Sequence, residues 1–303
     1  MISLATRAPF HLEATVRVLQ RRPANVVDWW EDGRYLRLFE LSGSLSLVEV
    51  RNHGTVARPR VRLRIVAGDE SAAAYAEARA CVRRMLGLDV DPAPLRRCAE
   101  SAAASRATCR ELRGMRPPRF ATLFEAFASV IPFQQLSLDA GTAIVARLVT
   151  HFGQRLAHDG RRFHAFPTAR RIARARLDSL RACGFSRPKA QTLRGVARAI
   201  DTCELRETGL ARMDTDEAMA RLVELPGIGP WSAGLVLLRG LGRLDVFPPG
   251  DVGAARNLRN LMQLDPRAPL EPIIEKFGSC RGYLYFCALG GALLRSGLIH
   301  PAH

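Results

Sequence analysis

The chain has 303 residues, 48% of them apolar, a length and composition that allow two domains with proper hydrophobic cores. Lys and Arg number 45 against 29 Asp and Glu, and the net charge of +16 predicts a polyanionic partner, with nucleic acid the first candidate. Seven cysteines without a C-x-x-C pair, and the lack of any long apolar run, argue against a disulfide framework and a membrane span.

Residues 1–112 are predicted to form an α+β domain with an antiparallel sheet. Three strand-like runs follow one another, Tyr35–Phe39, Ser44–Val50 and Val61–Ile65. In the third run apolar residues alternate with arginine, which predicts a sheet with one dry and one wet face. The arginine face is interpreted as a solvated outer surface, with DNA contact as the alternative. The Ala-rich segment from Ser71 to Met85 is predicted to be a helix that covers the dry face.

Residues 113–303 are predicted to form a helical second domain that begins at a Pro- and Gly-containing linker. The expected helices include Thr122–Ile131, Ser137–Phe152, Leu177–Cys183, Lys189–Ile200, Gly253–Met262 and Pro272–Leu294. Thr168 is a candidate N-cap, and Asp214 with Glu217 is a candidate capping box. The arginine-rich run Ala169–Arg176 is interpreted as a solvated helix face, with a DNA groove as the alternative.

A short Gly-rich segment, Leu225–Gly229, lies between two helix-like segments, Glu217–Glu224 and Trp231–Arg239. Its two glycines permit a tight turn, and Pro230 suits the first turn of the second helix. This pattern predicts a helix–hairpin–helix whose second helix presents free N–H groups, a ready site for a phosphate. A turn between two helices that binds no ligand is the alternative.

One carboxylate stands near this hairpin in the sequence. A Pro- and Gly-rich bend, Asp245–Gly250, follows the second helix and ends at Asp251. Asp251 is a candidate functional residue, and its simpler role is to cap the helix that follows. The two roles are compatible, and Asp245 is interpreted as structural.

Leu225–Ala233 together with Asp251 resembles the signature of the helix–hairpin–helix DNA glycosylase superfamily. Further segments are similar to the bacterial 3-methyladenine DNA glycosylase II type, namely Ile131–Ser137, Phe166–Thr168, Gly184–Ala190 and Arg281–Tyr283. The order of a β-rich domain followed by a helical domain agrees as well. The resemblance implies a base-excision enzyme that acts on damaged double-stranded DNA, with Asp251 as its catalytic residue.

The expected reaction is hydrolysis of an N-glycosidic bond, which develops positive charge on the sugar. An ionised Asp251 can stabilise that charge and orient the attacking water. A purine alkylated at N3 or N7 is already a cationic leaving group, so one carboxylate can suffice. Superfamily members that also cleave the DNA backbone carry a lysine where this chain has Trp231, so we expect a monofunctional enzyme that leaves an abasic site.

Trp231 is expected to stack on a cationic base, and a plain core position is the alternative. The best-known family members line the base pocket with several aromatic residues. At the corresponding places this chain has Val18, Leu235, Val252 and Leu289. The resemblance therefore implies an aliphatic pocket, and a substrate range that is narrower than, or different from, the broad alkylated-purine range.

The resemblance also implies contacts with DNA. Gln135, with Gln134 beside it, is expected to fill the gap that a flipped base leaves, and a polar turn is the alternative. The other expected DNA-binding residues are Gly227, Ile228, Gly229, Ser232 and Arg256. Backbone carbonyls of Val223, Leu225 and Ile228 are expected to bind a monovalent cation, Na⁺ or K⁺. No cofactor is expected for catalysis, because the four-cysteine spacing of an iron–sulfur cluster is missing.

Damaged duplex DNA is thus the expected partner, and we expect a monomeric, soluble protein of the bacterial cytoplasm and nucleoid. A generally basic proteome is the alternative explanation of the positive charge. Besides lesions of the 3-methyladenine and 7-methylguanine type, two other functions stay open. The same scaffold could excise hypoxanthine or an oxidised purine, or it could bind lesions with weak catalysis. Asp251 argues against the last of these.

Overall fold

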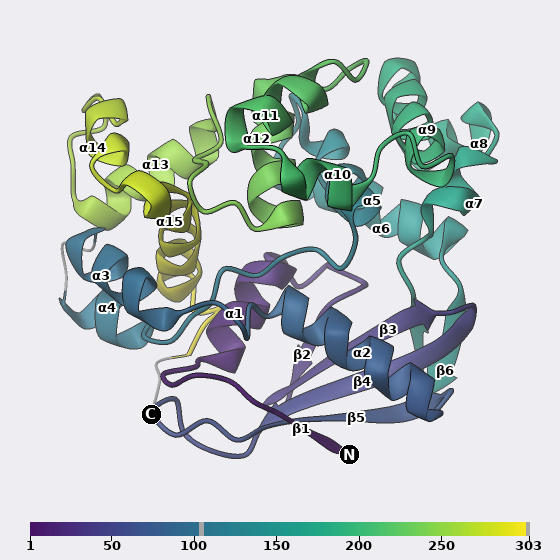
Figure 1. The fold of residues 1–303 in the computed structure, drawn as a ribbon, viewed down its shortest axis with the longest axis horizontal. Coiled ribbons are helices and arrows are strands. Elements are labelled where there is room, and N and C mark those ends of the chain that lie inside the picture. The colour runs from purple at the N-terminus through teal and green to yellow at the C-terminus, as the bar shows by residue number, and fades with distance from the viewer. Residues whose placement is uncertain (103–105, 301–303) are drawn as a thin grey trace.

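The computed structural model of the chain describes residues 1–102 and 106–300. These residues form two layers, a β-sheet with its covering helix and a larger set of helices that lies against it (Figure 1). The predicted α+β class is confirmed. In the described part of the chain, no helix is both long and apolar enough to cross a membrane.

The sheet contains five antiparallel strands in the order β1-β5-β4-β3-β2. Their bounds are Ile2–Leu4 for β1, Trp29–Glu31 for β2, Arg34–Leu41 for β3, Ser44–Asn52 for β4 and Val61–Gly68 for β5. The first apolar side chains of β5 are buried and the arginines between them are exposed, as predicted. Helix α2, Ala72–Met85, begins after its N-cap Ser71 and packs on β3, β4 and β5, so it covers one face of the sheet.

The opposite face of the sheet is partly covered too, which the sequence did not predict. Leucines of β3 and β4 pack there against Phe163 and Ala165 of the second layer. Phe163 belongs to a two-stranded hairpin, β6 Arg155–His158 and β7 Arg161–His164. The expectation of helix throughout this segment missed the hairpin, although its Asp159-Gly160 turn, with positive φ at both residues (48° and 71°), is a typical hairpin signal.

Helices make up most of the second layer. Apart from α2, the α-helices of the two layers are, in chain order, α1 Leu12–Gln20, α3 Pro92–Ala102, α4 Arg106–Glu111, α5 Leu123–Ala128, α6 Leu138–Phe152, α7 Ala169–Ala173, α8 Leu177–Ala182, α9 Arg187–Asp201, α10 Glu207–Arg212, α11 Thr215–Val223, α12 Pro230–Leu235, α13 Val252–Met262, α14 Glu271–Glu275 and α15 Arg281–Arg295. Thr168 caps α7, and Asp214 with Glu217 forms a complete capping box on α11, as predicted.

Two of the predicted helices are interrupted. The segment expected as Pro272–Leu294 consists of α14, a 3-10 turn (η3, Gly278–Cys280) and α15, because Gly278 adopts a positive φ of 49°. The segment expected as Trp231–Arg239 begins as α12 and then widens into a π-helix, η2, over Val236–Leu241. Short π-helices are frequent at functional sites.

One hydrophobic cluster runs through both layers, and it includes Leu4 of the sheet and Ile299 near the end of the described chain. Helix α3 packs on α15, which ties a segment before the predicted linker to the last helix. No disulfide joins the cysteines whose side chains are described, and the side chain of Cys109 is outside that set.

Candidate active site

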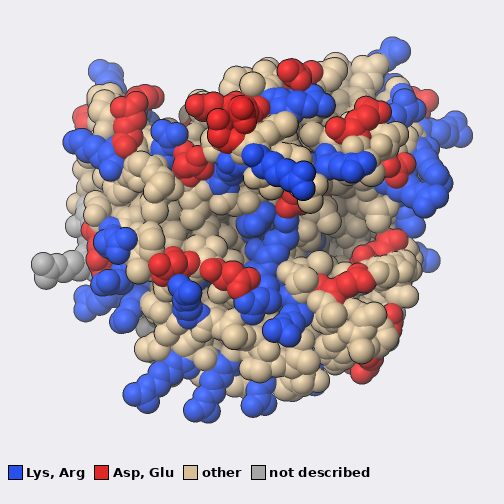
Figure 2. Space-filling model, viewed as in Figure 1, with Lys and Arg blue, Asp and Glu red and all other residues tan. Residues whose placement is uncertain are grey.

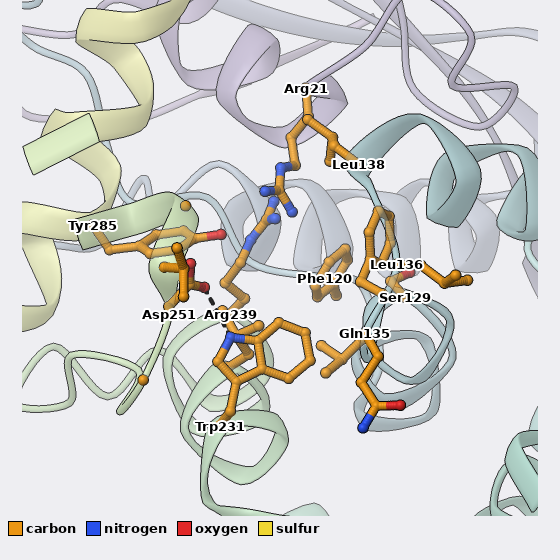
Figure 3. Close-up of a pocket in the computed structure, with 16 residues that line it drawn as sticks. Arg21, Phe120, Ser129, Gln135, Leu136, Leu138, Trp231, Arg239, Asp251 and Tyr285 are labelled. Atoms are coloured by element: carbon orange, nitrogen blue, oxygen red, sulfur yellow. Dashed lines mark hydrogen bonds between the residues drawn. The ribbon is translucent and has the colours of Figure 1, made fainter. Parts of the chain in front are cut away.

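A cavity of about 520 Å³ lies where α12, the bend before α13 and the loop after η1 (Ile131–Phe133) come together (Figure 3). This volume is within the range of small-molecule sites. Its lining comes from segments far apart in the sequence and consists of Arg21, Phe120, Ser129, Val130, Phe133, Gln135, Leu136, Leu138, Trp231, Leu235, Arg239, Gly250, Asp251, Val252, Gly253 and Tyr285. The hairpin helix and the predicted carboxylate therefore meet at one cavity.

Asp251 is both the N-cap of α13 and part of the cavity wall. Its Oδ1 accepts a hydrogen bond from the backbone N–H of Ala254 (2.7 Å), and its Oδ2 accepts one from the indole N–H of Trp231 (3.0 Å). Gly250 before it has a positive φ of 70°, which turns the bend into the helix. Asp251 thus caps a helix, as considered for it, and also lies in the wall of a cavity.

Trp231 is the second residue of α12, which begins at Pro230 after the N-cap Gly229. Figure 3 shows its indole N–H directed at Asp251. Because an indole has a single donor, this bond fixes the orientation of the ring and leaves the ring as an apolar wall of the cavity. Trp231 is half-buried: it packs against the hydrophobic core and also lines the cavity.

The remaining predicted pocket residues divide into two pairs. Leu235 and Val252 line the cavity, and Val252 is 79% exposed. Val18 and Leu289 are buried and are not among the lining residues, so their placement in the pocket needs correction. The side chain of Val18 belongs to the hydrophobic core, and only its carbonyl, which accepts a long hydrogen bond from Arg239 (3.4 Å), connects it with the site.

Three aromatic residues that the sequence did not assign to the pocket also line it, Phe120, Phe133 and Tyr285. The expectation of an aliphatic pocket is corrected by their presence. A signal existed in the chain, because Phe133 lies inside the family-like segment Ile131–Ser137 and Tyr285 follows the family-like segment Arg281–Tyr283.

Two arginines reach the same cavity, and the sequence did not assign them either. Arg239 is only 2% exposed, and its guanidinium carbon lies 4.6 Å from the centre of the Phe120 ring. Burial lowers the pKa of Arg239 to about 10, so it remains protonated at neutral pH. The guanidinium of Arg21, at the end of α1, meets that of Arg239 in the cavity (Figure 3). Arg239 was visible in the sequence as a lone charge in an otherwise apolar helix.

The hairpin is held by contacts within the protein. Nε2 of Gln134 donates to the carbonyl of Gly227 (2.9 Å) and to Oγ of Ser232 (3.0 Å). The N–H of Ile228 donates to the carbonyl of Leu225 (3.0 Å). Since the side chains of Ile228 and Ser232 are buried, these two predicted DNA contacts shape the hairpin from inside and do not present side chains to a ligand.

Other predicted DNA-binding residues are accessible. Gln135 is exposed, lines the cavity and adopts a positive φ of 55°. Its neighbour Leu136, which the sequence did not single out, is 44% exposed and also lines the cavity. A Cβ added to Gly229 would meet no atom within 4 Å, so the start of α12 is open. Arg256 is exposed on α13.

The two lysines of the chain lie outside the cavity lining. Lys189 of α9 uses its ammonium to donate to the carbonyls of Pro132 (3.2 Å) and Gln134, so it supports the loop that carries Gln135. Burial lowers the pKa of Lys189. Lys276 is exposed at the end of α14.

Basic side chains are prominent on the face shown in Figure 2, both around its rim and between the two layers. In the run Ala169–Arg176 the arginines of α7 are exposed, and Ile172 and Ala173 are buried. Acidic side chains lie among them, and the basic ones supply the positive charge that binding of a polyanion requires.

Known proteins share both halves of this architecture. Residues 128–280 match the family model described as HhH-GPD superfamily base excision DNA repair protein, and residues 1–122 match the AlkA N-terminal domain. A solved structure, a 3-methyladenine DNA-glycosylase from Archaeoglobus fulgidus, superposes with a TM-score of 0.78. It covers 97% of this chain and 99% of its own, and at 24% sequence identity it shows a shared fold.

Two curated relatives are similar in sequence. A DNA-3-methyladenine glycosylase of Bacillus subtilis is 28% identical over 194 residues, which are 64% of either chain. A probable bifunctional transcriptional activator/DNA repair enzyme AlkA of Mycobacterium tuberculosis is 31% identical over 255 residues, which are 83% of this chain and 49% of that protein. The matched part of the chain thus spans 64% of the length of the first relative and 49% of the second.

Proposed function

Because the chain belongs to the HhH-GPD superfamily of base excision DNA repair proteins, we propose that it is a DNA glycosylase that hydrolyses the bond between a damaged base and its sugar. The damaged nucleotide is flipped out of the duplex into the cavity, and an abasic site remains. The observation that carries the proposal is a carboxylate, Asp251, hydrogen-bonded to Trp231 in the wall of a base-sized cavity.

Asp251 supplies the charge that the reaction requires. As the bond from base to sugar lengthens, positive charge develops on the sugar, and a carboxylate held in place stabilises it without reorganisation. The hydrogen bonds from Ala254 and Trp231 hold this carboxylate at the cavity wall. The same group accepts a proton from the attacking water.

We propose that cleavage stops at base release. A backbone-cleaving step requires an amine that attacks the sugar. No lysine lines the cavity within the described part of the chain, and the position where such an amine is expected holds Trp231. The ammonium of Lys189 is occupied by two carbonyls of the loop after η1.

The loop between η1 and α6 is proposed to enter the duplex when the base leaves it. Gln135 and Leu136 are exposed at the edge of the cavity, whereas Gln134 is bound to the hairpin. Inserted side chains of this kind occupy the space in the base stack that flipping vacates. The geometry therefore favours Gln135 and Leu136 over Gln134.

The hairpin is proposed to bind a DNA phosphate through backbone N–H groups at the open start of α12, beside Gly229. Carbonyls of the hairpin suit a monovalent cation at the same place. Those of Val223 and Ile228 accept no turn or capping hydrogen bond from the described backbone, and that of Leu225 accepts one. Such carbonyl oxygens are suitable ligands for a hard cation, whose charge would attract the phosphate.

Alkylated purines of the 3-methyladenine and 7-methylguanine type are the first candidates for the lesion, and the name of the Bacillus subtilis relative supports them. Excision of hypoxanthine or an oxidised purine is the second candidate. One observation favours it: Arg21 and Arg239 bring positive charge into the cavity, and positive charge repels a cationic base.

Substitution of Asp251 by Asn tests the proposal. Asn is a good N-cap, so α13 should keep its structure, while the negative charge is lost. We expect single-turnover base release from duplexes with 3-methyladenine, 7-methylguanine or hypoxanthine to slow by about a hundred- to a thousandfold. Binding to a duplex with an abasic-site analogue should change little.

The matched control is Asp265→Asn, which changes an exposed carboxylate in the loop after α13 and should leave the rates unchanged. Equal base release by the wild type and Asp251→Asn on every lesion would contradict the proposed function. A covalent complex trapped by borohydride would contradict the hydrolytic route, since it requires an attacking amine.

A further inference from the structure

Arg239 is a buried charge without a carboxylate partner. Its side chain is almost completely enclosed, and no Asp or Glu of the described residues forms an ion pair with it. Its protein contacts are the ring of Phe120, a hydrogen bond to Tyr285 and a long hydrogen bond to the carbonyl of Val18 (3.4 Å). Buried charges are otherwise paired, because removing them from water is costly.

Arg21 brings a second positive charge to the same place. No described residue accepts a hydrogen bond from its guanidinium, which lies 5.8 Å from the ring centre of Phe133. Arg21 also has a positive φ of 61°, a conformation that non-glycine residues rarely adopt and that persists only where the surrounding structure imposes it. Strained residues of this kind are concentrated at functional sites.

The backbone around Arg239 is fixed so that the side chain stays at the cavity. In the π-helix η2 the carbonyl of Arg239 accepts the N–H of Phe120 (2.8 Å). The next carbonyl, of Gly240, accepts hydrogen bonds from Arg84 (2.7 Å) and Arg119 (2.9 Å). The guanidinium therefore cannot withdraw by a simple movement of its helix.

Two guanidiniums that lie side by side in one cavity repel each other, and the Nε of each is buried without a hydrogen-bond acceptor. A ligand that supplies acceptor atoms would offset the repulsion and satisfy unpaired donors. A purine with a carbonyl at C6 presents two adjacent acceptors, O6 and N7, and arginine binds this edge with two hydrogen bonds. A purine alkylated at N3 or N7 brings a positive charge instead. The two guanidiniums carry charge of the same sign and oppose such a base.

On the basis of the proposed glycosylase function, we infer that Arg239 and Arg21 make this pocket selective for a neutral 6-oxopurine, such as hypoxanthine, over a cationic alkylated purine. The walls agree with this substrate class, because Trp231, Phe120 and Tyr285 offer flat or apolar surface to any purine ring. These walls provide few hydrogen-bond donors, and the two guanidiniums provide N–H donors for the polar edge of the base.

The arginines also assist the bond cleavage that such a base requires. When the bond from the sugar to N9 breaks, its electron pair remains on the purine, so a neutral oxopurine leaves with negative charge on its ring. Guanidinium donors at O6 and N7 stabilise that charge in the transition state. Water gives its hydroxyl to the sugar and a proton to Asp251, and the released base takes up one proton from solvent.

A cationic alkylated purine needs no such help, since the same electron pair only neutralises it. The two kinds of base should therefore respond in opposite ways to the loss of a guanidinium. This difference separates a role in recognition from a general role in the structure of the pocket.

The test compares wild type, Arg239→Met and Arg21→Met on duplexes that contain hypoxanthine and on methylated DNA that releases 3-methyladenine. Rates are expressed as enhancement over spontaneous release, because the methylated base is far more labile. We expect the wild type to show the larger enhancement with hypoxanthine. Arg239→Met should lower the hypoxanthine rate by about ten- to a hundredfold and leave the 3-methyladenine rate unchanged or higher.

Arg116→Met is the matched control. Arg116 is also buried, its guanidinium carbon also lies over an aromatic ring (Phe10, 5.8 Å), and its Nε is also without a partner, but it does not line the cavity. Its loss should change the two rates by the same factor or not at all. Arg21→Met, at a half-buried position, repeats the test if Arg239→Met does not fold, and it should shift the ratio of rates in the same direction.

Three results overturn the inference. A wild type that releases 3-methyladenine with the larger enhancement, in a manner that depends on Asp251, removes the inference and leaves the glycosylase function intact. Equal loss of both activities in Arg239→Met, with Arg116→Met unaffected, shows that the guanidinium does not discriminate. Absence of any release that depends on Asp251 removes the proposed function as well.

Discussion

Arg37 and Arg239 are both buried arginines, and their surroundings are opposite. Arg37 of β3 donates to Asp28 (2.8 Å) and to Glu125 (2.5 Å), which are themselves buried. Arg239 is buried to the same degree, 2% exposed in either case, but it has a ring face, a hydroxyl and a distant carbonyl in place of carboxylates.

The difference separates a structural charge from a functional one. The ion pairs of Arg37 join the sheet to α5, and its charge is neutralised within the protein. The ring, hydroxyl and carbonyl that contact Arg239 stabilise its charge but do not neutralise it. The guanidinium can therefore interact electrostatically with a molecule in the cavity. Because burial strengthens electrostatic interactions, an available charge at such a site acts strongly on a ligand.

Removal of Arg37 should have the largest effect on stability. In Arg37→Met, Asp28 and Glu125 would be left as buried carboxylates without a counter-charge, and such losses cost about 3–5 kcal/mol. Urea unfolding at neutral pH measures this loss. Arg239→Met removes a charge that no carboxylate balances, so we expect its free energy of unfolding to stay within about 1 kcal/mol of the wild type.

Equal destabilisation by the two substitutions would contradict the proposed difference, because it would mean that the charge of Arg239 is as well balanced as that of Arg37. An Arg239→Met variant more stable than the wild type would show that the charge of Arg239 reduces stability. That result is typical of functional sites, where residues kept for activity reduce stability.

The sequence analysis assigned no role to Arg239. Asp251, Trp231 and the glycines of the hairpin could be predicted because their pattern is local, and the structure brings Asp251 and Trp231 together. A lone arginine between apolar helical residues was also visible. That Arg21 meets it depends on the packing of α1 against the second layer, which no local pattern contains.

The same distinction applies to the fold. Strand β5, the capping box of α11 and the N-cap of α7 follow from periodicity and capping residues, and the structure confirms them. The break of the last helix at Gly278 and the π-helix η2 depend on backbone conformations that tertiary contacts select. The placement of Val18 and Leu289 failed because a family-like position does not say toward which side of a helix a side chain points.

A smaller effect should distinguish how the two arginines are supported. The ring of Phe120 lies 4.6 Å from the Arg239 guanidinium, and the ring of Phe39 lies 5.1 Å from that of Arg37. A double-mutant cycle of Arg239→Met with Phe120→Leu should give a coupling energy of about 1 kcal/mol, the size of a partly desolvated cation–π contact. The cycle of Arg37→Met with Phe39→Leu should give less, because carboxylates already balance that charge.

Thermal or urea unfolding of the two single variants and the double variant measures each coupling. Coupling at Phe39 that equals or exceeds coupling at Phe120 would contradict the idea that the ring substitutes for a carboxylate beside Arg239.

The smallest effect is expected where an arginine is paired but exposed. Arg64 of β5 donates to Glu49 (2.7 Å), with 44% of its side chain exposed. Glu49 is buried, but without Arg64 it would keep Arg34 and Arg51 as partners. Because Arg64 itself is exposed to solvent, Arg64→Gln should lower the free energy of unfolding by no more than about 1 kcal/mol. Arg62→Gln, an exposed arginine of the same strand with no carboxylate partner among the described residues, is the control and should change nothing.

The pH dependence shows whether the pair is the cause. Burial alone would raise the pKa of Glu49, but the hydrogen bonds and charges of Arg64 and Arg51 outweigh it, and the pKa is lowered below 4.5. An acidic group whose pKa is lower in the folded than in the unfolded chain stabilises the fold at any pH above its unfolded-state pKa. This stabilisation disappears as the pH falls through the folded-state pKa. The difference between wild type and Arg64→Gln should therefore shrink as the pH falls below 4.5. If the difference in free energy of unfolding between wild type and Arg64→Gln is constant with pH, Arg64 acts through packing of its side chain and not through its ion pair. Pairing with a carboxylate would then not be the property that distinguishes Arg37 from the arginines of the cavity.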